Sequence, residues 1–129
     1  MKRDLAFSVE IWDNNRMEIV ADKIEMARLR EMARNHFGDL VKAVVDVEKG
    51  VMVVDGELQA DEERLLLENS SAKEDLWGIN LYTDVEGPDW IEFDSMINLR
   101  PWQGNNSRGV DDAELRRRIV AIVEGLVGR

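Results

Sequence analysis

The sequence contains no cysteine, and its 129 residues include a single histidine, His36. Without cysteine the chain has no disulfide framework, no thiolate nucleophile and no zinc site of the cysteine type. One histidine cannot form the paired ligand set of a zinc enzyme, and no serine lies in a nucleophile elbow. These absences argue against thiol, zinc and Ser-His-Asp enzymes. We expect His36 to cover the edge of the core or the last carbonyls of a helix.

Long apolar runs and glycine-rich phosphate motifs are also missing. No stretch approaches the roughly 18 to 20 apolar residues that cross a bilayer, and the start, MKRDLAFSVEIWDNN, has acids too early for a secretory leader. We therefore expect a cytoplasmic protein without a membrane partner. Neither a GxGxxG sequence nor a Walker motif occurs, and the sequence leaves any cofactor unknown.

Positive charge is scarce: 17 Lys and Arg residues face 27 Asp and Glu residues, which gives a formal net charge of -10. This balance opposes nucleic-acid binding, which depends on cations that neutralise phosphates. The cluster Arg116, Arg117 and Arg118 fans around a predicted helix because consecutive positions lie about 100° apart. We expect no nucleic-acid partner. The hydrophobic share of 44% and charged share of 34% indicate one soluble globular domain.

The apolar periodicity predicts an α+β fold. Helical spacing covers about 24–36 and 61–69, and a last helix follows a cap at Asp111. Two β-branched runs around Gly50 predict a hairpin, and further strands are expected at 76–83 and 91–100. We predict an antiparallel sheet of four to five strands, covered by two longer helices and one short helix in a single layer. Residues 1–16 form an N-terminal extension of uncertain structure, and residues 17–129 form the domain.

The predicted strand at 91–100 and the loop behind it carry the best candidate site. Strand alternation puts Asp94, Asn98 and Arg100 in a row, each about 7 Å from the next, and this row becomes a pocket wall if another element covers it. The loop at 98–108 is dense in amide, hydroxyl and guanidinium groups, and Gly104 and Gly109 let backbone amides approach a ligand.

Guanidinium groups bind carboxylates and phosphates by paired hydrogen bonds, so the chemistry predicts a small anionic ligand. Arg100 and Arg108 would anchor it, with Asp94 orienting Arg100. The expected donors are Asn98, Gln103, Asn105 and Ser107. Asp111 and Asp112 count against an anion here. An alternative of about equal weight is a loop that caps its own backbone with Asn and Ser side chains and pairs its arginines with Asp94 or Glu57.

Two other functions stay open. A metal-dependent hydrolase or phosphoryl-handling enzyme would use Glu57, Asp61 and Asp94, with Glu62 as a further metal or acid/base candidate. Helix capping and a solvated face explain Asp61 and Glu62 better than such a role does. Alternatively, Trp102, inside the polar loop, would suit a subunit contact in a homo-oligomeric or partner-binding protein without catalysis.

Four segments in order, FGDLVKAVVDVEKGVMVVDGELQADEE, LWGINLY, WIEFDSMINLRP and GNNSRGV, resemble a family of small prokaryotic proteins, domain of unknown function 5674. The similarity covers about Ile24 to Val127 and leaves the first sixteen residues outside. It implies a soluble single domain and brings no known activity. Its characteristic positions are Glu57, Asp61, Glu62, Asp94, Asn98, Arg100, Pro101, Asn105, Ser107 and Arg108. The family often has histidine where this chain has Gln59, which weakens a role for that position as base or ligand.

Overall fold

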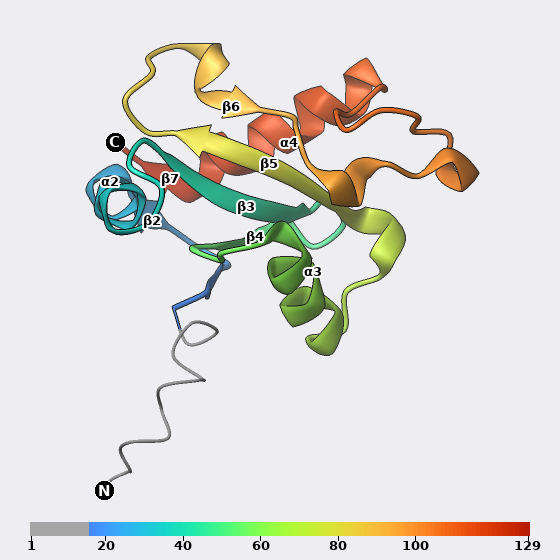
Figure 1. Cartoon of the computed structure of the whole chain (residues 1–129), viewed down its shortest axis with the longest axis horizontal. Coiled ribbons are helices and arrows are strands. Elements are labelled where there is room, and N and C mark those ends of the chain that lie inside the picture. The colour runs from blue at the N-terminus through green and yellow to red at the C-terminus, as the bar shows by residue number, and fades with distance from the viewer. Residues whose placement is uncertain (1–15) are drawn as a thin grey trace, which may run out of the picture.

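The computed structural model describes residues 16–129, and the predicted N-terminal extension lies outside them apart from Arg16. In the described part, five strands form an antiparallel sheet in the order β1-β4-β3-β5-β6 (Figure 1). The strands are β1 (Glu18–Val20), β3 (Leu40–Asp46), β4 (Val51–Val54), β5 (Leu76–Tyr82) and β6 (Ile91–Glu92). The predicted α+β class and antiparallel sheet are therefore confirmed.

The centre of the sheet is the predicted hairpin of β3 and β4. Gly50 takes the positive φ of 71° that the turn needs. Asp46, at the end of β3, accepts hydrogen bonds from the backbone amides of Glu48 and Lys49, both at 2.9 Å. On its other side β3 pairs with β5 from Leu40 to Asp46. The hairpin thus fixes the register of the strands that carry the site.

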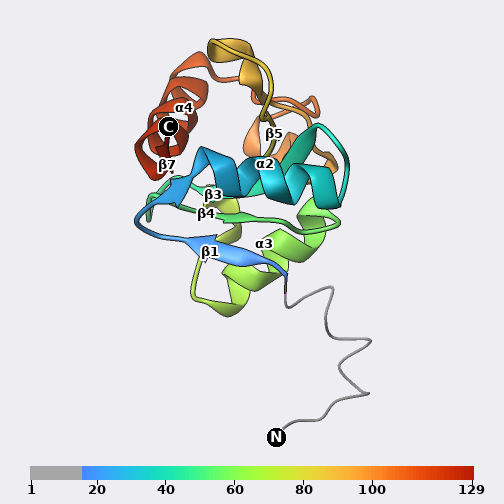
Figure 2. The same cartoon turned by 90° about the vertical axis from the view of Figure 1, so that its left-hand side faces the viewer.

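Helices cover both faces of this sheet (Figure 2). The helices are α2 (Met26–Asn35), α3 (Gln59–Glu68) and α4 (Ala113–Leu126). The two that were expected to share one face, α2 and α4, do so, but α3 packs on the opposite face. The predicted single layer is wrong because β3 and β4 are apolar on both sides. Val44 and Val53 point away from α2 and α4, and Leu66 of α3 covers them.

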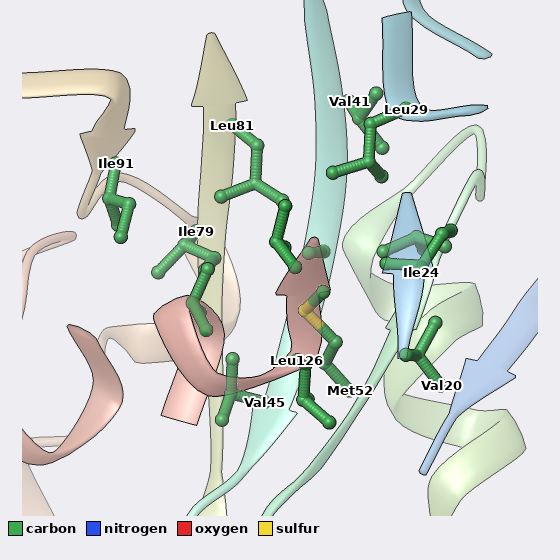
Figure 3. Packing of buried hydrophobic residues seen from close by; sticks show 14 of the residues in the cluster. Val20, Ile24, Leu29, Val41, Val45, Met52, Ile79, Leu81, Ile91 and Leu126 are labelled. Atoms are coloured by element: carbon green, nitrogen blue, oxygen red, sulfur yellow. The ribbon is translucent and has the colours of Figure 1, made fainter. Parts of the chain in front are cut away.

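The main core lies between the sheet and the pair α2 and α4. Figure 3 shows how its aliphatic side chains interdigitate across β3, β4, β5 and the helix ends. Leu29, Val45, Met52, Ile79 and Leu81 are each fully shielded from solvent. This burial of apolar surface is the main stabilising contribution to the fold. Within residues 16–129 no helix is long and apolar enough to span a membrane.

A second, two-stranded sheet joins distant parts of the chain. β2 (Ile24–Glu25), just before α2, pairs in parallel with β7 (Val127–Gly128), just after α4. The pairing brings Gly128 so close to Glu25 that a Cβ there would lie 2.8 Å from Glu25 Oε2. Both helices on the core face are therefore tied together at one end.

The strand expected at 91–100 stops at Glu92, which corrects that prediction. A short 3-10 helix, Met96–Asn98, replaces its second half, and Ser95 Oγ accepts from the Ile97 amide at 3.3 Å. Gly78 of β5 makes the close approach possible, because a Cβ there would lie 2.6 Å from Ser95 Oγ. The row of Asp94, Asn98 and Arg100 along one strand face does not form.

Candidate functional site

Arg100 points into the protein and is 1% exposed. Its Nε donates to Ile97 O at 2.8 Å, Nη1 to Lys73 O at 2.9 Å, and Nη2 to Leu76 O. Glu63 supplies the counter-charge, with Oε2 at 3.7 Å from Nη2. The guanidinium therefore holds the loop against the end of β5, and its donors are occupied by the protein.

The loop amides are likewise used for the backbone. Beyond the end of β6, the Asn98 side chain takes the place of a strand as the hydrogen-bond partner of Gly78 in β5. Its Oδ1 accepts from Gly78 N at 2.8 Å, and its Nδ2 donates to Gly78 O at 2.9 Å. Buried Asn105 donates to the carbonyls of Asn98 and Gly109, both at 2.8 Å, and accepts from Asp111 N at 2.8 Å. These two side chains cap the backbone of their own loop. This is the structural alternative to ligand binding that the sequence left open.

Gln103 and Ser107 also have protein partners. Gln103 accepts from Arg100 at 3.3 Å and donates to Glu74 O at 2.8 Å. Ser107 Oγ donates to Asp111 Oδ1 at 2.6 Å, and this bond, together with one from the Asn106 amide, lowers the pKa of Asp111. The polar loop is thus largely satisfied by its own groups.

Arg108 differs from the rest of the loop because its side chain is 53% exposed. Its Nε donates to Asp94 Oδ1 at 2.6 Å. The structure therefore brings Asp94 to Arg108, whereas Asp94 was expected to orient Arg100. Of the two expected anchors, Arg108 is the one placed where a ligand could reach it.

Arg108 borders a groove of about 200 Å³ on the α3 face of the sheet. The other lining residues are Lys42, Leu58, Gln59, Ala60, Ser95, Met96 and Ile97. Gln59 and Ala60 open α3, and Leu58, at the N-cap, gives this helix end no side-chain cap. The first amides of a helix lack intrahelical partners and carry partial positive charge. The groove thus combines two cationic side chains with a helix N-terminus.

A polar network extends from the groove along the sheet. Gln59 Nε2 donates to Asn80 Oδ1 at 3.1 Å, and Asn80 Nδ2 donates to Glu92 Oε1 at 2.9 Å. Tyr82 OH donates to the same Glu92 oxygen at 3.1 Å. Burial first, and then this hydrogen bond and the charge of Glu92, raise the pKa of Tyr82. The network fixes the orientation of Gln59 at the groove.

Sequence reasoning missed Lys42 and Asn80 as members of this region. Lys42 and Asn80 face each other in the β3–β5 register, and Asn80 faces Glu92 in the β5–β6 register. The sequence signal that could have identified them is a polar residue, in each strand, at a position that faces the protein and not the solvent. These positions converge only once the strand order is known, because neighbours in the sheet are far apart in the sequence.

Several titratable groups gather near the junction between β4 and α3. Glu62 is fully buried, which raises its pKa well above 4.5; its Oε2 accepts from Gly56 N at 2.9 Å, and its Oε1 has no hydrogen-bond partner among the described residues. His36 Nδ1 lies 4.0 Å from Asp55 Oδ1. Asp55 has a φ of 70°, and burial raises its pKa. Backbone strain of this kind concentrates at functional sites.

The acids expected to hold a metal are dispersed. Exposed Glu57 lies beside His36 at 3.9 Å, Asp61 pairs with Arg64 at 3.5 Å, and Asp94 pairs with Arg108. In the part of the chain that the structure describes, no three acid or histidine side chains gather to hold a metal ion. The ligand set that the metal-dependent hypothesis needs is not assembled.

Comparisons with known proteins agree with the resemblance seen in the sequence. A search of curated proteins and a search of solved structures both find no match. The model of one family, described as Protein of unknown function (DUF5674), matches residues 18–126, which include every strand of the main sheet and all three described helices. The chain therefore belongs to the DUF5674 family.

Proposed function

We propose that this protein binds a small anionic ligand, of phosphate or carboxylate type, in the groove between Lys42, the first turn of α3 and Arg108. One observation carries the proposal: two side-chain cations and an uncapped helix N-terminus line the same hollow. Within residues 16–129 no carboxylate lies within 4.0 Å of the Lys42 ammonium, since none of the ion pairs there includes it. The Lys42 ammonium instead lies over the Phe37 ring, 4.9 Å from its centroid, so a ligand anion would meet no paired carboxylate there.

The groove favours a compact ligand. Its volume of about 200 Å³ is below the roughly 300 to 1,000 Å³ of pockets for drug-sized molecules. Charge-assisted hydrogen bonds from Arg108 and Lys42 would orient an anion, and the amides of Gln59 and Ala60 would add donors. Asp94 competes with the ligand for Arg108, and the net charge of -10 repels anions at long range. We therefore expect modest affinity that weakens as salt is added.

Fewer of the expected residues are available to contact a ligand than the sequence suggested. Arg108 serves as anchor, and Asp94 holds it in position until an anion replaces that carboxylate. Five of the expected contacts support the loop instead of the ligand: Asn98, Arg100, Gln103, Asn105 and Ser107. The cytoplasmic location and the lack of a nucleic-acid partner stay predictions from the sequence.

Titration calorimetry with inorganic phosphate, pyrophosphate and succinate at low ionic strength tests this function. Loss of one charged hydrogen-bond donor costs about 1.5 to 3 kcal/mol, so Lys42→Gln and Arg108→Gln should each weaken binding by about tenfold or more. Arg64→Gln is the matched control, because Arg64 is an exposed arginine of α3 that does not line the groove. Equal binding by all three variants, or no binding by the wild type, would contradict the proposal.

A specific surface supports a second candidate, self-association or partner binding without catalysis. Trp102 is 76% exposed, Met96 64% and Leu99 41%. With Glu63, Lys73 and Ile97 they line a hollow of about 260 Å³. Exposed indoles are typical of protein interfaces. Sedimentation velocity over a range of concentrations should show an oligomer that Trp102→Ser removes; a monomer at all concentrations would contradict self-association.

A further inference from the structure

A hollow of about 690 Å³ lies on the opposite face of the sheet from the anion groove. One wall is a single stripe of α4, because its residues are spaced by three and four positions. They are Ala113, Arg116, Arg117, Val120 and Ala121. The other wall comes from the edge strand β6 and its neighbours, with Ile91 and Phe93 as its apolar side chains. The stripe is about 12 Å long at 1.5 Å per residue.

Arg116 gives this apolar groove a cationic end. Its Nη1 donates to the carbonyl oxygens of Val110, at 2.5 Å, and Asp111, at 3.3 Å, which fixes the guanidinium in place. None of the ion pairs within residues 16–129 includes Arg116, whereas its neighbour Arg117 is paired with Glu114 at 2.5 Å. A fixed guanidinium without a paired carboxylate is prepared for a ligand carboxylate.

We propose that this groove binds an amphipathic carboxylate, whose apolar body lies along Phe93, Val120 and Ala121 and whose head group meets Arg116. The volume falls within the roughly 300 to 1,000 Å³ of small-molecule sites, and such sites combine apolar walls with few oriented polar groups. Asp89 is the single acid of the lining, so the groove favours one anionic end instead of a cationic ligand.

Decanoate, kept below its aggregation concentration, is the probe, and its binding to the whole chain can be followed by calorimetry and by two-dimensional NMR. Ala121→Glu should abolish binding, because it places a charge on the apolar wall at an exposed position that folding tolerates. Arg116→Gln should weaken binding by about tenfold. The control is Arg118→Gln, which removes a neighbouring arginine of α4 that does not line the groove.

This inference does not depend on the anion groove, and the variants separate the two. Decanoate binding should survive Arg108→Gln, and phosphate binding should survive Ala121→Glu. Wild-type decanoate affinity in Ala121→Glu would overturn the proposal, as would shifts of NMR signals confined to the α3 face. A dimer that Ala121→Glu dissociates, in a protein that binds no decanoate, would also overturn it by assigning the groove to a second copy of the chain.

Discussion

The guanidinium carbon of Arg100 lies 4.6 Å from the centroid of the Trp77 ring. The same guanidinium donates to three backbone carbonyls and faces buried Glu63. We predict that Arg100→Leu lowers the free energy of unfolding by about 3 kcal/mol or more, because it leaves these acceptors and the Glu63 charge without a partner. Urea unfolding measures the change. Arg117→Leu, at an exposed position, should change stability by about 0.5 kcal/mol or less, and a similar small loss in Arg100→Leu would refute a structural role.

Gly56 and Gly125 form a matched pair for a test of close packing. A Cβ on Gly56 would lie 2.5 Å from Glu62 Cγ, whereas nothing lies within 4 Å of a Cβ on Gly125. We expect Gly56→Ala to destabilise the fold by about 1 to 3 kcal/mol through overpacking. Gly125→Ala, in the exposed last turn of α4, should be neutral or stabilise by up to about 1 kcal/mol. Thermal unfolding of both variants measures these effects. Equal melting temperatures would show that the junction between β4 and α3 tolerates a methyl group at Gly56.

Buried Glu62 should make stability depend on pH. Its pKa is raised in the folded state, so the folded protein keeps this proton where the unfolded chain has lost it. The contribution of Glu62 to the free energy of unfolding is therefore at its maximum below about pH 4.5. It declines as pH rises toward the folded pKa, by at most about 1.4 kcal/mol per pH unit. Glu62→Gln should remove this decline and be more stable than the wild type near neutral pH. Urea unfolding from about pH 5 to pH 8 measures it, with exposed Glu68→Gln as the control. If the free energy of unfolding of the wild type and of Glu62→Gln changed with pH in parallel, ionisation of the Glu62 carboxyl would not destabilise the fold.

The pairing of Asp94 with Arg108 predicts a gain of affinity. Asp94→Asn removes the charge that competes for Arg108 while it keeps the size of the side chain. We expect phosphate to bind more tightly by up to about fivefold, since a half-exposed ion pair is worth up to about 1 kcal/mol. The comparison is Asp84→Asn, which releases Arg30 away from the groove and should leave affinity unchanged. Weaker binding in Asp94→Asn would mean that Asp94 positions Arg108 for the ligand.

The features of the fold that depend on local pattern could be predicted from the sequence. Alternation and Gly50 identified the β3–β4 hairpin, and the apolar stripe identified α4. The second helix layer was missed because Val44 alternates with the charged residues Lys42 and Asp46, so this side of β3 does not look apolar in the sequence. Its burial under α3 depends on Val53 and Leu66, which other segments contribute.

The site was harder to predict because the function of a polar side chain depends on its partners. Arg100 and Arg108 are the same residue type in one loop, yet the first is 1% exposed and the second reaches the surface. The difference arises at Gly78 and Ser95, whose close approach ends β6 and turns the chain inward. No periodicity in the sequence records that contact.

The parallel pair of β2 and β7 also constrains the order in which the molecule can form. Ile24 lies near the beginning of the described domain, and its partner Val127 follows the last helix. During synthesis the ribosome delivers these partners at opposite ends of translation, so α2 emerges long before its neighbour α4 exists. Closure of such a distant contact is entropically slow. The apolar side of α2 can pack against β3 early in synthesis, but the end of the core that β2 and β7 close stays open until the domain is almost complete.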